Sequence, residues 1–263
     1  MNKHAKVISV YGGYLHGTGV STMALSLSIF IQQITDKKVL LINLDNERSL
    51  LEKFIERDVD IKHSIDDIKV YEESLKLEVI ENHLDIINDN LSLISKSKTG
   101  KTSPEFVDKL IEIAKKKFNF IIIDAGNNPS EKLLENGDIS IHISEYNELI
   151  LENTVKNIKN DDTLIIFNKF SIEYSSNLTI TSFKKKYSIT NEIFTVNYDQ
   201  DIFTEACEKR KLYSFLIKKL NSKNTCINNV LNIALYVAEY SKVKVQKKYE
   251  KRGLVDGWNL KIF

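Results

Sequence analysis

The chain has 263 residues, 42% of them hydrophobic, which is enough to bury one core of ordinary size, so we expect one main domain. Lysine and arginine (37) almost balance aspartate and glutamate (36), which excludes a protein that attracts nucleic acid or an acidic partner through its overall field. The two cysteines, Cys207 and Cys226, have no metal-ligand spacing and indicate reduced thiols in a cytoplasmic protein, with a disulfide as the alternative.

Export and membrane insertion are not indicated by the apolar segments. The N-terminal residues lead directly into a strand-like run, without the apolar core of about 7 to 15 residues that a signal peptide needs. The longest apolar helical stretch, Val230 to Ala238, is well short of the roughly 18 residues of a membrane span. We therefore expect a protein that touches a membrane at most peripherally.

Four runs rich in isoleucine, valine, leucine and phenylalanine predict strands. In chain order they are KVISVY from Lys6, KVLLINLD from Lys38, FNFIIIDAG from Phe118 and DTLIIFNKF from Asp162. Each run is nearly continuous in apolar residues, as in strands of a parallel sheet that is covered on both faces. Weaker strand patterns lie at residues 91–95, 138–144 and 192–196.

Helical patterns separate these runs, at residues 22–33, 49–56, 105–117, 148–158, 201–220 and 226–240. The alternation predicts an α/β fold with a mostly parallel, doubly wound sheet flanked by helices. Two prolines and no Ser/Gly-rich tract leave no interdomain linker, and residues 95–104 are the best candidate for a loop. We expect one domain over residues 1–241 and a basic and apolar tail over residues 242–263.

A glycine-rich turn follows the first predicted strand, in ISVYGGYLHGTGVSTMALSLS from Ile8 to Ser28. Such turns hold phosphate by directing backbone N–H groups at it from a helix N-terminus. Val20 stands where the pattern has lysine, and Tyr14 stands where it has its first glycine. A turn that binds nothing is the alternative interpretation. The candidate phosphate-binding residues are Gly17, Thr18, Gly19, Val20, Ser21 and Thr22.

A second match, TGKTSP from Thr99, does contain a lysine. The full pattern needs a glycine five residues before Gly100, and Ser95 stands there. Pro104 is typical of a first helical turn, so Thr102 or Ser103 is predicted to cap a helix. No phosphate role is assigned to Lys101.

Five stretches, in this order, resemble the ParA/MinD superfamily of deviant-Walker ATPases over roughly residues 6–215. They are GTGVSTMALSLS, KVLLINLDNE, FNFIIIDAGNNP, LIIFNK and VNYDQDIFTEACEKRKLYSF. The resemblance implies a P-loop NTPase fold that binds ATP or ADP with Mg²⁺ and forms a homodimer. It implies that the loop binds phosphate, with Thr22 near the α-phosphate, that Ser21 and Asp124 hold the metal, and that Asn168 contacts adenine.

The chain departs from this family at three positions that bear on hydrolysis. The family's signature lysine falls at Leu15, its loop lysine at Val20, and the first aspartate of its Asp-x-Asp motif at Asn43. An asparagine can orient a water but cannot accept its proton, and an uncharged loop stabilises transition-state charge poorly. We therefore assign no catalytic residue and expect at most a weak ATPase.

The form GTGVST resembles loops of the TadZ/CpaE branch, which helps to place pilus and secretion machinery, although we expect no counterpart here of the extra receiver-like domain that this branch often carries. Our first hypothesis is thus a nucleotide-binding positioning or scaffold protein with protein partners in a membrane-associated machine. A second is an active partition-type ATPase, acting on DNA or a membrane, with an unrecognised cation in place of Val20. A third is a structural protein that has lost nucleotide binding.

Several single residues also have a plainer interpretation. Asp45 and Asp124 could cap turns after their strands, and Asn168 could close one. His16 is more simply a solvated loop residue, and the other histidines lack metal spacing. The tail from Lys242 could dock on its own domain or a partner, or lie on an anionic membrane through lysines and Trp258. DNA binding by the basic run lacks any base-reading motif.

Overall fold

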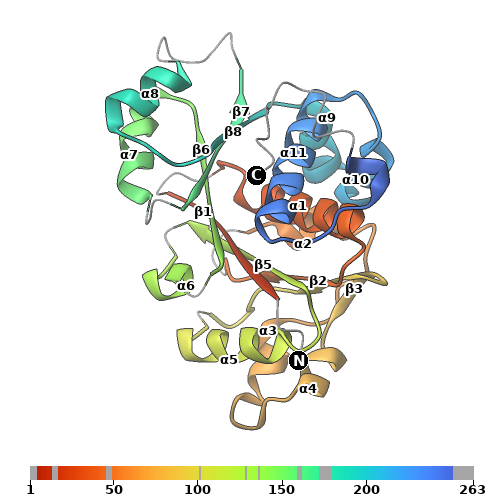
Figure 1. The fold of residues 1–263 in the computed structure, drawn as a ribbon. Coiled ribbons are helices and arrows are strands. Elements are labelled where there is room, and N and C mark those ends of the chain that lie inside the picture. The colour runs from red at the N-terminus through yellow and green to blue at the C-terminus, as the bar shows by residue number, and fades with distance from the viewer. Residues whose placement is uncertain are drawn as a thin grey trace.

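The structure is a computed structural model that describes residues 5–13, 17–45, 49–100, 102–127, 129–135, 137–158, 162–171 and 179–250. Its centre is a twisted sheet with helices on both faces (Figure 1). No helix in these ranges is long and apolar enough to cross a bilayer.

In the described part of the chain, eight strands form one sheet in the order β3-β4-β2-β5-β1-β6-β7-β8. Neighbouring strands run parallel except the edge pair β3 and β4. The predicted mostly parallel, doubly wound α/β fold is confirmed. The strands are β1 (Lys6–Gly12), β2 (Val39–Asn43), β3 (Asp85–Asn88), β4 (Leu91–Ile94), β5 (Phe120–Asn127), β6 (Ile139–Glu145), β7 (Leu164–Phe170) and β8 (Ile193–Asn197).

The helices cover the two faces unequally. One face packs on a single large core under α1 (Val20–Thr35), α2 (Leu51–Ile55), α10 (Leu212–Lys219) and α11 (Thr225–Tyr240). The other face carries two separate cores, each beneath its own group of helices (Figure 1). The first lies under α3 (Ile65–Lys69), α4 (Leu77–Asn82), α5 (Pro104–Ala114) and α6 (Glu131–Glu135), and the second under α7 (Glu148–Asn157) and α8 (Ile180–Tyr187).

The first helix is buried along nearly its whole length, because it lies between the sheet and α11. Leu25, Ile29 and Phe30 are fully inaccessible to solvent. Burial of large apolar side chains contributes about 1.5–3 kcal/mol each, so this helix is held firmly. The loop that precedes it is therefore attached to a rigid strand at one end and a rigid helix at the other.

All seven strands predicted from sequence are confirmed, and the helix predicted over residues 201–220 is wrong as a single helix. The chain there forms α9 (Gln200–Phe203), a π-helical turn (Thr204–Glu208) and, after a break, α10. Arg210 in the break has a left-handed backbone, with φ of 57°. Its carbonyl accepts a hydrogen bond from the N–H of Arg57, so a tertiary contact accompanies the break.

The described start of the predicted tail lies on the domain. The backbone N–H of Gln246 donates to the carbonyl of Ile34 at 2.8 Å, and its side-chain amide donates to the carbonyl of Gln33 at 3.1 Å, so it caps the end of α1. Tyr249, in the short helix α12 (Lys247–Glu250), is 1% exposed in the large core. Residues 251–263, with Trp258, lie outside the described ranges.

Candidate functional site

The glycine-rich turn joins the central strand β1 to α1. Gly17 and Gly19 have left-handed backbones, with φ of 81° and 94°, which side chains other than glycine adopt at a cost. Gly19 is the N-cap of α1 and no side chain caps this terminus. The first N–H groups of a helix have no partner within it, and the helix dipole favours an anion there. Leu15 and His16 lie outside the described residues.

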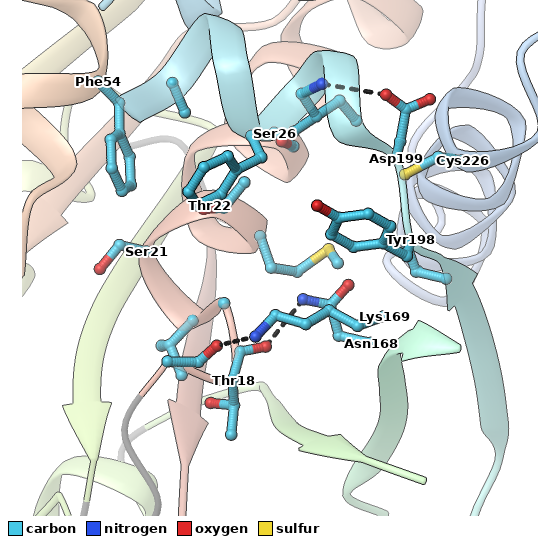
Figure 2. Close-up of a pocket in the computed structure, with 18 of the residues that line it drawn as sticks. Thr18, Ser21, Thr22, Ser26, Phe54, Asn168, Lys169, Tyr198, Asp199 and Cys226 are labelled. Atoms are coloured by element: carbon cyan, nitrogen blue, oxygen red, sulfur yellow. Dashed lines mark hydrogen bonds between the residues drawn. The ribbon is translucent and has the colours of Figure 1, made fainter. Parts of the chain in front are cut away.

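A cavity of about 390 Å³ opens beside this turn (Figure 2). One wall is the turn and the first part of α1, from Gly17 to Met23 and on to Ser26. The facing wall combines the ends of β7 and β8 with α9 and the π-helical turn, including Asn168, Tyr198 and Phe203. Tyr198 and Phe203 are 56% and 52% exposed, so two aromatic rings stand at the rim. The deeper wall is apolar, with Phe54, Ala206 and Val230.

Asn168 and Lys169, at the end of β7, reach across to the turn (Figure 2). The amide nitrogen of Asn168 donates to the carbonyl of Thr18 at 2.8 Å. It is so close that a Cβ added to Gly19 would lie 2.2 Å from it, which leaves room only for glycine. The ammonium of Lys169 donates to the carbonyl of Gly17 at 2.5 Å and pairs with Glu145 at 2.8 Å. Sequence reasoning assigned no role to Lys169, although it directly follows Asn168.

On the other side of the turn, Ser21 faces Asp124 through Ser49. The hydroxyls of Ser21 and Ser49 are 3.0 Å apart, and that of Ser49 donates to a carboxylate oxygen of Asp124 at 3.2 Å. Asp124 is fully buried, and the N–H of Gly126 also donates to it, at 3.2 Å. Burial raises the pKa of Asp124 to about 6, and the nearby charge of Asp45 acts in the same direction, while hydrogen bonds from Ser21, Gly126 and Ser49 oppose it.

Asn43 belongs to the same network, beside Asp124 in the register of β2 and β5. Its amide nitrogen donates to the hydroxyl of Ser49 at 3.0 Å and to the carboxylate of Glu52 at 2.9 Å. That carboxylate also accepts the N–H of Lys96, whose ammonium donates to the carbonyl of Ser49 at 2.5 Å. Sequence reasoning did not predict that Ser49, Glu52 and Lys96 join Asn43 in one network. The one indication in the sequence was a polar residue, Ser49, at the start of a predicted helix.

The chemistry of these groups matches two ligands. A hydroxyl and a carboxylate, as in Ser21 and Asp124, are the oxygen donors that Mg²⁺ prefers. Backbone N–H groups at an uncapped helix terminus, beside a largely apolar slot, suit a phosphorylated compound with a flat, apolar part. The described residues contain no cluster of three or more His, Cys, Asp or Glu side chains that could hold a metal alone.

The predicted site residues are thus brought together in two groups. Gly17, Thr18, Gly19, Val20, Ser21, Thr22 and Asn168 all line the cavity. Asp124 is not among the lining residues and accepts hydrogen bonds from Ser21 and Ser49. Asp45 lines the cavity as well, and its backbone N–H bonds to the side chain of Asn43 at 3.1 Å. The roles of these residues toward nucleotide and metal stay predictions.

Comparison with known proteins gives a fold but no sequence family: no family model matches the chain, and no curated protein does. Among solved structures, it is similar to a ParA family ATPase from Chlorobium tepidum (TM-score 0.73, 19% identity, 90% of this chain and 100% of that one). The MinC:MinD complex of Aquifex aeolicus matches with a TM-score of 0.71 and 15% identity, over 89% and 96% of the two chains. The MinD of Pyrococcus horikoshii with Mg-ADP matches at 0.62 and 16%, over 94% and 98%. The chain therefore has the fold of ParA/MinD ATPases.

Proposed function

We propose that the protein binds ATP or ADP with Mg²⁺ in this cavity and acts as a nucleotide-dependent positioning or scaffold protein that hydrolyses ATP slowly or not at all. One observation carries the proposal. The loop of Gly17 and Gly19 leads into an uncapped helix terminus beside a cavity of about 390 Å³, with Asn168 fixed at the loop.

Phosphate binding depends here on the backbone rather than on a loop lysine. The N–H groups of a phosphate loop and the dipole of the following helix remain when lysine is replaced by Val20. The nucleoside would lie along the apolar wall of the cavity, with Asn168 as the polar contact to the base and the rings of Tyr198 and Phe203 at its rim. The similar MinD of Pyrococcus horikoshii was solved with Mg-ADP, which supports this choice of ligand.

Ser21 and Asp124 would hold Mg²⁺. The ion would supply positive charge to the phosphates, which this loop lacks. Hydrolysis has weaker support, because it needs groups that act on the attacking water and on the developing charge. The amide nitrogen of Asn43 donates to Ser49 and Glu52, its amide oxygen accepts from the N–H of Asp45, and the amide cannot take a proton from water.

The proposed partners rest on the resemblance to ParA/MinD proteins, and not on a feature of this protein's surface. We propose a homodimer that recruits protein partners in a membrane-associated machine; the GTGVST loop favours a pilus or secretion assembly, as in the TadZ/CpaE branch. The similar Aquifex MinD was solved in complex with MinC, which supports a protein partner for this fold. Partition on DNA or a membrane, with active hydrolysis, is the alternative that the next experiment separates.

The experiment combines calorimetric titration with a phosphate-release assay on the full chain. We expect ADP and ATP to bind in the presence of Mg²⁺ and phosphate release to stay near buffer background. Turnover of about 1 s⁻¹ or faster, in the ordinary range of enzymes, would favour the partition-type ATPase instead. No binding of any nucleotide would leave the structural protein as the remaining reading.

The metal assignment has its own test in Asp124→Asn. Removing the charge should weaken Mg-ATP binding by about 10-fold and Mg-free ATP binding much less, because only the former uses the carboxylate. Ser49→Ala is the matched control, since it removes a neighbour of Asp124 without removing its charge. Equal losses for the two forms of ATP in Asp124→Asn would make Asp124 a structural residue.

A further inference from the structure

The side chains of the cavity wall carry more negative than positive charge, which disfavours a phosphate ligand unless a cationic side chain contacts it. Asp45 and Asp199 both line the cavity and carry negative charge. Among the lining residues that the structure describes, Lys169 is the one cation. A nucleotide brings two or more negative charges, so it would enter a wall whose described ionised groups sum to −1. Within the described lining, a favourable side-chain charge can therefore come only from Lys169.

The position of Lys169 is enforced by the fold. The pairing of β7 with β8 shifts between Phe167 and Phe170, and Lys169 within that shift has a left-handed backbone, with φ of 52°. A left-handed backbone is disfavoured for a side chain such as lysine, and such residues are found preferentially at functional sites. Its side chain reaches the loop, where the ammonium donates to the carbonyl of Gly17 (Figure 2).

The ammonium of Lys169 can exchange one of its present partners for a ligand. Its partners are the carbonyl of Gly17, inside the phosphate loop, and the carboxylate of Glu145. The side chains of Lys169 and Glu145 are 42% and 34% exposed. An ion pair this exposed is weak, and an ammonium has three donors on a flexible stem. A phosphate oxygen near Gly17 could therefore replace Glu145 without the loss of the loop contact.

We propose that Lys169 supplies, from the end of β7, the positive charge that Val20 fails to supply from within the loop, and that it contacts the phosphate chain of the bound nucleotide. This inference rests on the proposed function, since it names the residue that pairs with the ligand's charge. It also answers the question that Val20 raises, because the positive charge comes from the end of β7 rather than from within the loop.

Lys169→Met tests this role, because methionine keeps most of the apolar stem and removes the charge. Titration with ADP and with adenosine separates the phosphate from the nucleoside. We expect ADP to bind about 10-fold more weakly than to the wild-type protein, the size of one lost charge-assisted contact, and adenosine to bind equally well. Lys169→Arg should stay within about threefold for ADP, because it keeps the charge.

Three further variants separate a lost contact of Lys169 from a change in folding. Lys209→Met removes an exposed lysine that pairs with Glu205 outside the cavity wall and should leave ADP binding unchanged. Glu145→Gln leaves Lys169 without its competing carboxylate and should tighten ADP binding about twofold to threefold. Adding Val20→Lys to Lys169→Met should restore most of the lost affinity, because it returns a cation to the same phosphates.

The outcomes distinguish the inference from the function on which it rests. If the wild-type protein binds ADP and Lys169→Met binds it equally well, the inference is wrong and the proposed function stands. If adenosine binding falls as much as ADP binding, Lys169 only holds the loop in shape, and the inference is again wrong. If the wild-type protein binds neither compound, the proposed function fails and the inference fails with it.

Discussion

The two sides of the loop around Gly19 differ in how their polar groups are used. Toward β7 the loop borders a cavity of about 390 Å³ with exposed aromatic rings at its rim. Toward β5, Ser21 enters a chain of hydrogen bonds through Ser49 to Asp124 and Asn43. The cavity side offers space to a ligand. The side with Ser21, Ser49 and Asp124, which we propose as the metal side, already forms hydrogen bonds within the protein.

Because the two sides differ in this way, nucleotide binding and hydrolysis can depend on different parts of the site. The cavity side depends on backbone shape and helix polarity, which persist through many side-chain changes. The metal side depends on side chains whose acidity and position must suit the chemistry. A protein can therefore lose hydrolysis through Val20 and Asn43 and keep a nucleotide as a signal of state. Substitutions that change one side at a time can therefore show whether binding and hydrolysis depend on different residues.

The largest effect is expected for Gly19→Ala. The added Cβ would lie 2.2 Å from the amide nitrogen of Asn168, at a backbone φ of 94° that disfavours alanine. Displacing Asn168 and the loop together should weaken ADP binding by about 100-fold or more, comparable to the loss of several contacts. Calorimetric titration measures this loss.

Gly17→Ala is the matched control. Its φ of 81° is equally unfavourable for alanine, but an added Cβ would meet no atom within 4 Å. The variant should cost only about 1–2 kcal/mol of stability through the backbone and weaken ADP binding much less. Equal binding losses in the two variants would show that strain in the loop, and not its contact with Asn168, decides the affinity.

The next effect, on the metal side, is a change in stability with pH. Burial raises the pKa of Asp124 to about 6, above its ordinary value of 3.8. The native state therefore holds a proton that the unfolded state has lost, and the free energy of unfolding falls as pH rises from about 4 to 6. The amide introduced by Asp124→Asn stays neutral at every pH, so the free energy of unfolding of this variant near pH 7 without Mg²⁺ should exceed that of the wild-type protein by about 3 kcal/mol, as measured by denaturant unfolding.

His142 provides the control, because its pKa shifts the opposite way. Burial lowers the pKa of His142 to about 4, so the unfolded state binds the extra proton between about pH 4 and 6.5. Its contribution to stability is present above pH 6.5 and is lost as pH falls toward 4. The two slopes oppose each other from pH 4 to 6. Asp124→Asn should thus become more acid-sensitive than the wild-type protein, and His142→Phe less; an unchanged profile in Asp124→Asn would refute the raised pKa.

The fold could be predicted because long apolar runs in the sequence indicate its buried central strands. The strands around Ile8, Leu41 and Ile122 are buried on both faces, and such runs have few alternatives in a chain of this size. The missed elements are short. α3 has five residues with two buried, Ile65 and Ile68, and α8 buries only Phe183, so neither shows a full helical period.

The residues of the candidate site that lie close together in the sequence could be predicted. Those that come from distant parts of the chain and meet only in the folded protein were missed. Gly17, Gly19 and Ser21 lie within one short turn, so their spacing alone indicated a phosphate loop. Ser49 and Lys169 meet this turn only after folding, and a single serine or lysine carries no spacing of its own. Sequence reasoning left open an unrecognised cation in place of Val20, and Lys169, whose ammonium contacts the carbonyl of Gly17, is the residue that we propose for that charge.

The smallest effect is expected for Val20→Lys, which returns the missing charge to the loop. Val20 is 7% exposed and lines the cavity while its side chain packs in the large core, so a lysine there must direct its ammonium out along the cavity wall. The apolar stem of lysine can cover such a wall while its head reaches the phosphates. Because the loss of packing offsets part of the new attraction, ADP binding should tighten only about threefold to 10-fold, and more at low salt. Val20→Met, which fills similar space without charge, should leave the affinity unchanged. An equal gain in both variants would assign the effect to packing. No gain in Val20→Lys would mean that the loop does not hold phosphate, and the cavity would then not be a nucleotide site.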